Sequence, residues 1–433
     1  MGRRSRTARL TVWMNGEEVG GWRVDSRGEH ELSYADSWLS HPDRRPLSLS
    51  MPLRPEPYRG PLVHDYFDNL LPDSDAIRRR LQARFGTRSS GAFDLLAEVG
   101  RDCVGAVQLV AGDHLAPDPR SIQGQPLTDE EVAGILAGVQ APPLGQRTGE
   151  EFRISLAGAR EKTALLRHSD TWMRPLGPTP TTHILKLPIG QAAQGIDLST
   201  SVENEWLCHR ILNEFEVPVA ACAMATFGDQ KTLIVERFDR RPSRGGCWIV
   251  RLPLEDLCQA TGTPGARKYE NEGGPGIRTV MDVLLGSHQA REDRLDFFRT
   301  QVLFWLLCAI DGHAKNFSLF LEPQGRFRLT PRYDVLSAYP VIGPGMLHAR
   351  EVTMAMAVWA KNRHYRWHDI GRRHWVETAR ACSLSGADAC LDDLAARVPS
   401  VVEAVAAALP AGFPDRVAGP ILDGLRRCGS RLG

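Results

Sequence analysis

Alternating hydrophobic and polar positions at the start of the chain predict β-strands. One such run covers residues 10–14, Asn15 and Gly16 follow it, and a second run covers residues 19–24. Alternation places successive side chains on opposite faces of a strand, and an Asn-Gly pair favours the tight turn between two antiparallel strands. Residues 8–34 are therefore expected to form short strands with turns, beginning with a hairpin.

A helical period replaces the alternation further along the chain. Ile77, Leu81 and Phe85 recur at intervals of four residues, which places them on one side of a helix over residues 75–85. Residues 92–112 show both patterns in turn and are expected to form a helix followed by a strand. The first part of the chain should thus mix both kinds of element.

The patterns divide the chain into four stretches. Residues 1–112 form the strand-rich unit just described, and residues 113–149 are expected to be linker-like because five prolines and several glycines surround a short helix at 128–139. Residues 150–260 predict a small lobe rich in strands, and residues 261–433 a helical lobe. The elements expected in the two lobes are strands at 152–156, 162–166 and 183–188, a helix beginning near Ser201, strands at 217–227 and 231–238, an apolar helix at 297–310 and a hairpin at 315–334.

Composition narrows the class of protein. The 433 residues include 53 lysines and arginines and 52 aspartates and glutamates, a net charge of +1, which excludes binding of nucleic acid by bulk charge alone. Nine widely spaced cysteines without a C-x-x-C pair favour a reduced, cytoplasmic protein without disulfides or structural zinc. No apolar run approaches the ~18 residues that cross a bilayer, and no signal peptide is recognised, so no membrane partner is expected.

Lysine is rare in this chain. Only six of the 53 basic residues are lysine, at positions 162, 186, 231, 268, 315 and 361. A lysine inside a motif is then of interest, because a compact, mobile ammonium group differs chemically from the planar guanidinium of arginine. Three of the six fall in motifs described below.

The clearest chemical signal is the segment from Asp311 to Asn316, which follows the apolar helix. An aspartate and an asparagine five residues apart, on a loop leaving a buried helix, are typical of phosphotransfer: the aspartate accepts the proton of the substrate hydroxyl and the asparagine binds magnesium. Asp334 ends the next hairpin and supplies the second carboxylate that a metal bridging two phosphates requires. Each residue alone has a plainer interpretation as a turn or cap, but their order favours phosphotransfer.

The small lobe offers the other parts of a nucleotide kinase in the required order. Lys186 ends the sequence His-Ile-Leu-Lys, which has the register of the kinase motif Val-Ala-Ile-Lys, whose lysine contacts the α- and β-phosphates. Glu203 or Glu205 would hold that lysine, although either also suits a helix N-terminus. Residues 236–238 would frame an adenine, and the turn at 157–161 is a weak candidate for the phosphate loop. We therefore expect an α+β, bilobal, protein-kinase-like fold with an extra N-terminal strand-rich subdomain and an all-helical C-terminal lobe.

These motifs, in this wording, resemble the HipA family of bacterial serine/threonine kinases, and the resemblance extends over essentially the whole chain. The strings that carry it are FDNLLPD at 67–73, GRDCVGA at 100–106, FRISLAGAREK at 152–162, TTHILKLP at 181–188, VERFDR at 235–240, DGHAKN at 311–316 and YD at 333–334. They are long and unusual. The match is therefore specific.

The resemblance implies a role for each matching position. Asp311 matches the family's catalytic base, Asn316 and Asp334 its magnesium ligands, and Ser155 the serine that it autophosphorylates. The positions that match its ATP pocket are Ala157, Gly158, Ala159, Arg160, Glu161, Lys162, Lys186, Glu236, Arg237, Phe238, His313, Ala314, Lys315, Asn316, Tyr333 and Asp334. A phosphate on Ser155 adds nearly two negative charges just before the phosphate loop, so repulsion should expel that loop.

The resemblance also implies an activity and partners. The family uses ATP and Mg²⁺ to phosphorylate a tRNA-charging enzyme, glutamyl-tRNA synthetase in the best-known branch, and is neutralised by HipB, a helix-turn-helix dimer that represses the operon. The same is expected here, with operator DNA contacted through that complex. Arg380 keeps a basic residue on the helical face that touches DNA, whereas Ser383 replaces a nearby basic position. Arg160 replaces the glutamine that is common in the phosphate loop.

Two other functions are alternatives to the kinase toxin. A catalytically weak kinase-fold protein that mainly binds HipB and DNA as a co-repressor would keep the fold, but it would tolerate loss of Asp311, Asn316 or Asp334, and all three are present. A small-molecule kinase of the antibiotic-modifying type shares the pocket but gives no reason for Ser155 ahead of the loop. Both remain alternatives to be separated by experiment.

Histidines and arginines near residue 370 give a weaker signal. His364, His368 and His374 include an i, i+4 pair that would share one helix face, as metal ligands do, but no cysteine or glutamate completes a tetrahedral set there. Surface histidines are the preferred interpretation. The basic run at 363–373 is expected to be a solvated helix face rather than a contact for a phosphate backbone.

Overall fold

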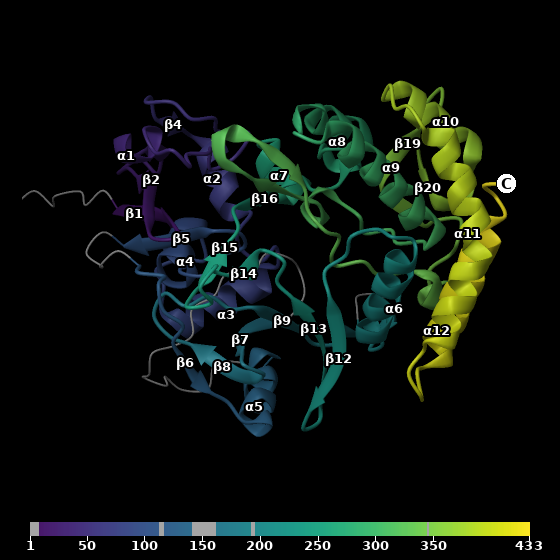
Figure 1. Cartoon of the computed structure of the whole chain (residues 1–433), viewed down its shortest axis with the longest axis horizontal. Helices are drawn as coiled ribbons and strands as arrows, with labels where there is room; N and C mark the ends of the chain where they lie inside the picture. Colours follow the sequence, from purple (N-terminus) through teal and green to yellow (C-terminus); the bar gives the residue numbers. More distant parts are fainter. Residues whose placement is uncertain (1–7, 112–116, 141–161, 192–194, 344–345) are drawn as a thin grey trace, which may run out of the picture.

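The computed structural model describes residues 8–111, 117–140, 162–191, 195–343 and 346–433. These residues form an N-terminal domain, a small lobe built on one sheet, and a large, mainly helical lobe (Figure 1). The three parts pack around a common centre, where the candidate site lies. The fold is the kinase-like, bilobal α+β fold expected from the sequence.

A five-stranded antiparallel sheet, in the order β4-β3-β2-β1-β5, organises the N-terminal domain. Its elements are β1 (Ala8–Met14), β2 (Glu17–Val24), β3 (His30–Tyr34), α1 (Asp36–Leu39), β4 (Tyr58–Arg59), α2 (Pro61–Asp68), α3 (Asp75–Phe85), α4 (Ala92–Val99) and β5 (Val107–Ala111). Asn15 and Gly16 have positive φ angles of 51° and 89°, as the tight turn between β1 and β2 requires. The predicted hairpin, the helix at 75–85 and the helix–strand pair in 92–112 are confirmed.

The core of this domain joins the sheet to α2. The Trp22 ring on β2 stacks on Phe67 of α2 with 3.9 Å between ring centroids, and both side chains are fully buried. Aromatic pairs of this size bury much of the apolar area that holds a small domain together. The chain that leaves α2 is thereby fixed against the sheet.

A six-stranded antiparallel sheet, in the order β12-β13-β9-β7-β8-β6, forms the small lobe. Its elements are β6 (Gly124–Pro126), α5 (Asp129–Gln140), β7 (Lys162–His168), β8 (Thr171–Pro175), β9 (His183–Lys186), β10 (Gly190–Gln191), β11 (Asp197–Leu198), α6 (Ser201–Glu214), β12 (Cys222–Phe227) and β13 (Gln230–Glu236). Leu185 packs with α5 on one face of the sheet, and Ile184 packs with α6 on the other. This follows from the alternation of side chains along β9.

Residues 117–140, the described part of the stretch expected to be linker-like, belong to the small lobe. Strand β6 pairs with β8, and Val132 and Leu136 of α5 are fully buried against the sheet. These two positions are four residues apart and lie on one side of the helix, which the count of prolines and glycines does not reveal. Packing, rather than local composition, decides the role of this stretch.

The large lobe is built around the buried helix α9. The elements of this lobe, together with the short strands before the lobe, are β14 (Arg240–Pro242), β15 (Ile249–Arg251), β16 (Leu254–Asp256), α7 (Leu257–Ala260), α8 (Ile277–Val283), α9 (Ala290–Leu306), β17 (Ser318–Leu321), β18 (Phe327–Leu329), β19 (Thr353–Trp359), β20 (Arg363–Arg366), α10 (Arg372–Ala381), α11 (Ala387–Ala407) and α12 (Asp415–Gly429). The expected hairpin at 315–334 is confirmed as β17 and β18, which β16 extends to three strands. A second hairpin, β19 and β20, adds to the helices of this lobe.

The second hairpin corrects the expectation of one solvated helix over residues 363–373. His364 lies on β20, His368 lies in a short 3₁₀ turn, and His374 lies on α10, so the three do not share a helix face. Within the described ranges no cluster of three His, Cys, Asp or Glu side chains has the arrangement of a metal site. The expectation of surface histidines is wrong for His374, which is 2% exposed, whereas His368 is exposed.

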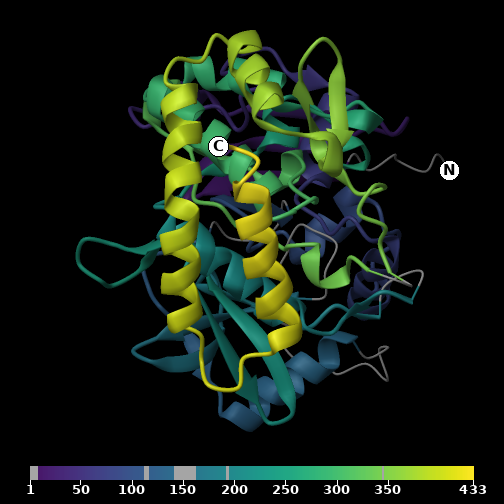
Figure 2. The same cartoon turned by 90° about the vertical axis from the view of Figure 1, so that its right-hand side faces the viewer.

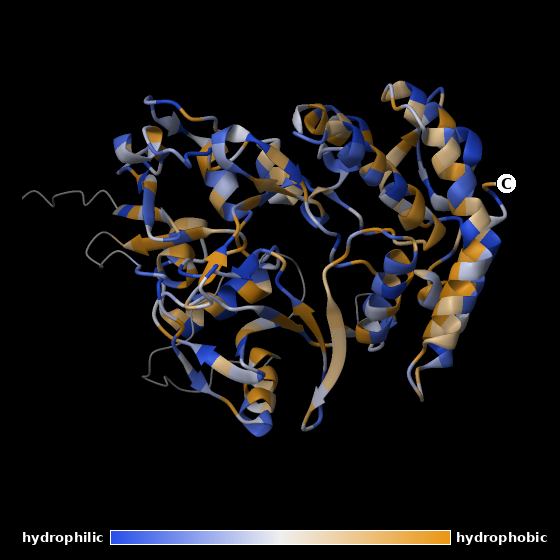
Figure 3. Cartoon of the chain, viewed as in Figure 1, coloured by the Kyte–Doolittle hydropathy of each residue, from blue (hydrophilic) through white to orange (hydrophobic). Residues whose placement is uncertain are grey.

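The two long C-terminal helices close one side of the molecule. Helices α11 and α12 run side by side and antiparallel (Figure 2), and each carries hydrophobic and hydrophilic positions along its length (Figure 3). Their apolar sides join the core of the large lobe, and Trp206 of α6 packs on Phe413, between the two helices. No helix in the described part of the chain is both long and apolar enough to span a membrane.

Candidate active site

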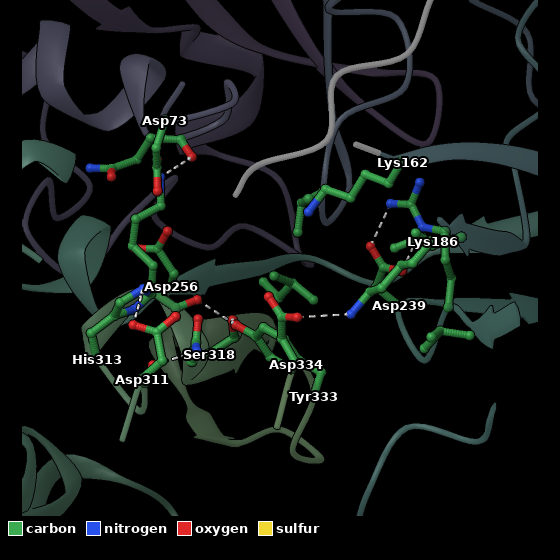
Figure 4. A pocket seen from close by; sticks show the side chains of 18 of the residues that line it. Asp73, Lys162, Lys186, Asp239, Asp256, Asp311, His313, Ser318, Tyr333 and Asp334 are labelled. Carbon is green, nitrogen blue, oxygen red and sulfur yellow. Dashed lines mark hydrogen bonds and ion pairs between the residues drawn. The ribbon is translucent and has the colours of Figure 1, made fainter. Parts of the chain in front are cut away.

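A cavity of about 410 Å³ lies where the three parts of the chain meet (Figure 4). Eleven of the residues singled out from the sequence line it, namely Lys162, Lys186, Glu236, Arg237, Phe238, Asp311, His313, Lys315, Asn316, Tyr333 and Asp334. They come from the small lobe and from the large lobe, as a cleft between two lobes requires. The N-terminal domain adds further lining residues, among them Asn69, Asp73 and Val104.

Lys186 is held at the small-lobe side of the cavity by two carboxylates. Its Nζ lies 2.5 Å from Glu205 Oε1 and 3.1 Å from Asp334 Oδ1. The side chains of Lys186 and Glu205 are 6% and 0% exposed, so this ion pair is withdrawn from solvent. The two carboxylates fix the direction in which the ammonium group points.

The structure chooses between the two glutamates that the sequence offered. Glu205 points from α6 to Lys186, whereas Glu203, two residues earlier, pairs with Lys231 on β13. Helical geometry explains the difference, since positions two apart face different directions. Spacing alone could not decide it, because both residues lie in the first turns of the helix.

Asp311 stands at the mouth of the cavity with its side chain 61% exposed. The hydroxyl of Tyr269 donates a hydrogen bond to Asp311 Oδ1 at 2.5 Å, and the Asn316 side-chain amide donates to the Asp311 main-chain carbonyl at 2.8 Å. Burial, with the adjacent Asp311 charge acting in the same direction, raises the pKa of Tyr269, so its hydroxyl remains a donor. The loop thus presents an oriented carboxylate to solvent.

Other residues of the loop are buried, which affects their protonation and their access to the cavity. It lowers the pKa of His313, whose ring meets that of Tyr269 edge-on, so this histidine is neutral near pH 7. Ala314, in the same loop, is fully buried and is not among the lining residues. The hydroxyl of Tyr333 donates to the Lys315 carbonyl at 2.9 Å and lies 2.6 Å from Ser318 Oγ, which ties the loop to the hairpin.

Asp334 is brought into the cavity by an unusual backbone conformation. Its φ is 58°, in the left-handed region, which non-glycine residues seldom adopt and which aspartate tolerates better than most. The side chain then reaches Lys186 from the opposite lobe. The ion pair therefore spans the cleft between the lobes.

Residues 236–238 have three different roles. The ring of Phe238 lies 5.7 Å from that of Tyr333 and makes an apolar wall of the cavity. Glu236 lines the cavity and is exposed. The Arg237 guanidinium, although at the lining, is engaged by Asp239 at 2.8 Å and by the Cys103 carbonyl at 2.8 Å. Arg237 therefore belongs to a buried network of ion pairs and hydrogen bonds within the protein.

That network links the N-terminal domain to the strand beside the cavity. Asp102 accepts hydrogen bonds from Arg240 and from the backbone and hydroxyl of Thr181, and Arg237 and Arg251 lie within ion-pair distance. Burial opposes its ionisation, but the three guanidinium groups lower the pKa of Asp102 far below the usual range. The network is a fixed anchor between the domains.

Sequence reasoning missed the contribution of Asp73. Its carboxylate pairs with Lys315 and Lys268, and these two ammonium groups outweigh the effect of burial and lower the pKa of Asp73 to about 2. Asp256 also lines the cavity, and burial raises its pKa to about 6 despite the nearby Lys315. The rarity of lysine marked Lys268, and the string at 67–73 marked Asp73, but nothing local placed them together.

Some candidates lie elsewhere. Ser155 and the phosphate-loop residues Ala157, Gly158, Ala159, Arg160 and Glu161 fall outside the described residues. Arg380 lies on α10, outside the cavity lining, with its side chain 70% exposed beside Glu377. The roles of these residues stay predictions.

Comparison with models of protein families shows to which family the chain belongs. The model of the HipA-like C-terminal domain matches residues 154–408, and that of the HipA N-terminal domain matches residues 10–110. The chain belongs to the HipA family. The first match takes in both lobes around the cavity, and the second takes in the N-terminal sheet.

Individual relatives agree with this assignment. The chain is 32% identical over 353 residues to the putative kinase Y4mE of Sinorhizobium fredii, a match that covers 80% of this chain and 82% of that one. It is 29% identical to the serine/threonine-protein kinase toxin HipA of Shewanella oneidensis, covering 76% of each chain. This HipA-family chain is therefore an enzyme of the kinase class.

A solved structure supports the fold. The Shewanella oneidensis MR-1 complex of HipA, HipB and operator DNA contains a chain that superposes on 98% of this one with a TM-score of 0.79 at 23% identity. The superposition also covers 98% of that chain. All three parts of the molecule thus have the HipA arrangement.

Proposed function

We propose that the chain is a serine/threonine-protein kinase toxin that transfers the γ-phosphate of ATP to a protein hydroxyl. The observation that carries this proposal is the ion-pair chain from Glu205 through Lys186 to Asp334, which ends in the same cavity as the loop bearing Asp311. In kinases a glutamate holds the lysine that contacts the nucleotide phosphates, and an acid from the other lobe faces it. The chain has both, on opposite sides of one cleft.

The residues present fit ATP and magnesium. The cavity has the size of a cofactor pocket and an apolar wall at Phe238, against which an adenine ring would pack. Asn316 and Asp334 would hold Mg²⁺, since both line the cavity and carry the hard oxygen donors that this ion prefers. Bound there, Mg²⁺ supplies neutralisation of phosphate charge. Lys186 and Lys162 add positive charge from the small lobe.

Asp311 acts as the base in this proposal. Its Oδ1 accepts a hydrogen bond from Tyr269, and among the described residues none donates to the other carboxylate oxygen, which would take the proton of an incoming serine hydroxyl. As the serine oxygen forms its bond to the γ-phosphorus, the bond from that phosphorus to the bridging oxygen breaks and ADP leaves. The exposure of Asp311 allows a protein substrate to reach it.

Partners and regulation are proposed from the family. The operator complex of Shewanella HipA and HipB supports a HipB-like antitoxin and, through it, operator DNA as partners, with Arg380 as a contact candidate. The resemblance supports glutamyl-tRNA synthetase as the substrate and Ser155 as the site of an autophosphorylation that switches the enzyme off. The reaction itself rests on the cavity and does not depend on these assignments.

Incubation with labelled ATP and Mg²⁺, with and without glutamyl-tRNA synthetase, tests the proposal. Asp311→Asn should reduce phosphotransfer by at least about 10²-fold, the range of general-base catalysis, while nucleotide affinity and the unfolding temperature stay near the wild-type values. Retained transfer in this variant would overturn the assigned base. A wild-type chain that transfers no label but binds a HipB-like protein on operator DNA would favour the co-repressor instead.

A further inference from the structure

The N-terminal domain places one carboxylate in the cavity. Asp73 follows Leu71 and Pro72 in the segment between α2 and α3, and its side chain points towards the large-lobe loop (Figure 4). Asp73 Oδ1 lies 2.6 Å from Lys315 Nζ, and Oδ2 lies 2.7 Å from Lys268 Nζ. One carboxylate of one domain therefore holds two ammonium groups of another.

Both lysines belong to the surroundings of the proposed base. Lys315 stands next to Asn316 on the loop, and the main-chain carbonyl of Lys268 accepts a hydrogen bond from the Ala314 amide at 3.2 Å. Tyr269, the next residue after Lys268, donates to Asp311. The two lysines thus lie on the two chain segments that flank the Asp311 carboxylate.

A second contact reinforces the connection between the domains. The Asn69 carbonyl accepts a hydrogen bond from Lys315 Nζ at 3.3 Å, and the Asn69 side-chain amide donates to the Thr263 carbonyl at 3.1 Å. Asn69 caps the C-terminal end of α2 and Asp73 lies four residues later, and both contact Lys315. The position of Lys315 is determined from outside its own lobe.

The two ammonium groups outnumber the Asp73 carboxylate that they share. Each ammonium has three N–H donors, and in the described part of the chain Lys268 Nζ gives one to Asp73, while Lys315 Nζ gives one to Asp73 and one to Asn69. The donors that remain suit phosphate oxygens, which carry the charge that develops during transfer. Two such cations repel each other, and the Asp73 carboxylate between them offsets that repulsion.

We propose that Asp73 is a positioning residue for phosphoryl transfer, which fixes Lys315 and Lys268 so that their ammonium groups stabilise the transferred phosphoryl group. This inference rests on the proposed kinase function and goes beyond it, because it makes the N-terminal domain part of the active site and Lys268 a phosphate contact. Displacing this domain from the loop would then stop catalysis without touching the nucleotide residues of the small lobe.

Asp73→Asn in the full-length chain tests the role, because the amide keeps the shape and removes the charge. The rate constant kcat for phosphotransfer should fall by at least tenfold, while the affinity for ATP stays within threefold of wild type or becomes tighter, since two cations lose their counter-charge. Asp68→Asn is the matched control: Asp68 pairs with Arg78 at 2.6 Å and is 23% exposed against 19% for Asp73, but the pair lies within the N-terminal domain. The control should keep wild-type kcat.

A double variant separates positioning from a general loss of stability. If Asp73 acts through the lysines, Asp73→Asn combined with Lys268→Ala should be no more than threefold slower than Lys268→Ala alone. The inference is overturned if the loss of kcat in the double variant equals the product of the losses in the two single variants. It is also overturned if Asp73→Asn keeps kcat within twofold of wild type.

If Asp73→Asn does not fold, Lys268→Ala decides alone: a tenfold loss of kcat supports the phosphate contact, and an unchanged kcat overturns it. An inactive wild-type chain overturns the proposed function and this inference together, whereas an active wild type with unaffected variants overturns only the latter.

Discussion

Lys186 Nζ lies 2.5 Å from Glu205 Oε1, between a strand and a helix of the small lobe. Both side chains are buried, and Asp334 is a second carboxylate partner of Lys186 across the cleft. Removing Glu205 takes away the carboxylate that holds Lys186 against α6 and leaves Asp334 as the other acid beside it. The pair therefore links the stability of the small lobe to the geometry of the cavity.

Glu205→Gln should impair phosphotransfer more than Glu203→Gln does. We expect kcat/KM for ATP to fall at least tenfold in the first variant and the free energy of unfolding to fall by about 3 kcal/mol, the usual cost of breaking a buried ion pair. Glu203 pairs with Lys231, which is half exposed, and does not line the cavity, so its variant should keep nearly full activity. Steady-state kinetics and urea unfolding of the two variants provide the measurement. Equal losses in both would contradict the special role of Glu205.

Tyr269→Phe should slow catalysis without weakening nucleotide binding. The variant removes the hydroxyl that orients Asp311 Oδ1, and a hydrogen bond to a charged group is worth about 1.5–3 kcal/mol, so kcat should fall about tenfold or more. The control is Tyr58→Phe, which removes a hydroxyl that donates to the Pro52 carbonyl in the N-terminal domain. Unchanged kcat in Tyr269→Phe would show that Asp311 needs no orienting partner.

Glu255→Gln should make the chain more stable at high pH. Burial raises the pKa of Glu255 to about 8 from an ordinary value of 4.5. Its Oε1 accepts the Leu49 amide at 2.8 Å, and within the described residues its Oε2 has no partner. A carboxyl whose folded pKa is raised contributes stability that is complete below about pH 4.5 and is lost as the pH rises through about 8. The glutamine variant avoids that loss.

The difference between Glu255→Gln and wild type should therefore be small near pH 4.5 and grow to the order of 1–3 kcal/mol at pH 8.5. Urea unfolding at a series of pH values measures it. Glu18→Gln, at a residue on β2 whose side chain is 39% exposed, serves as the control and should follow the wild-type curve. Parallel curves for wild type and Glu255→Gln would mean that Glu255 is ionised in the folded chain at neutral pH.

Phosphorylation of Ser155 should weaken ATP binding. The phosphate adds about −1.5 to −2 charge at pH 7 just before the segment expected to cradle other phosphates. Mass spectrometry after incubation with ATP should find the phosphate on this serine, and the phosphorylated chain should bind ATP at least tenfold more weakly than Ser155→Ala. Equal affinity of the two forms would contradict a switch at this position.

The local patterns predicted much of the fold because they depend on short-range geometry. The Asn15-Gly16 turn, the helix at 75–85 and the hairpin at 315–334 are confirmed. The second hairpin at β19 and β20 and the small-lobe role of α5 were not found. Their sequences give weak local signals, and long-range packing fixes them.

The candidate site shows the same division. Asp311 and Asn316 lie five residues apart on one loop, so their proximity was predictable, and the order of motifs correctly brought Lys186 and Asp334 to the same cavity. The pairing of Asp73 with Lys268 was not predictable, because it joins residues 195 positions apart.

The sequence by itself determined the family, the two-lobed kinase-like architecture and the chemical types of the residues around the cavity, because motif wording and hydrophobic period are local properties of the chain. Only the tertiary structure decided which glutamate holds Lys186, that Arg237 serves a buried network, and that the N-terminal domain reaches the proposed active-site loop through Asp73. Ion pairs depend on distance in space, and distance between remote segments is set by the packing of whole domains.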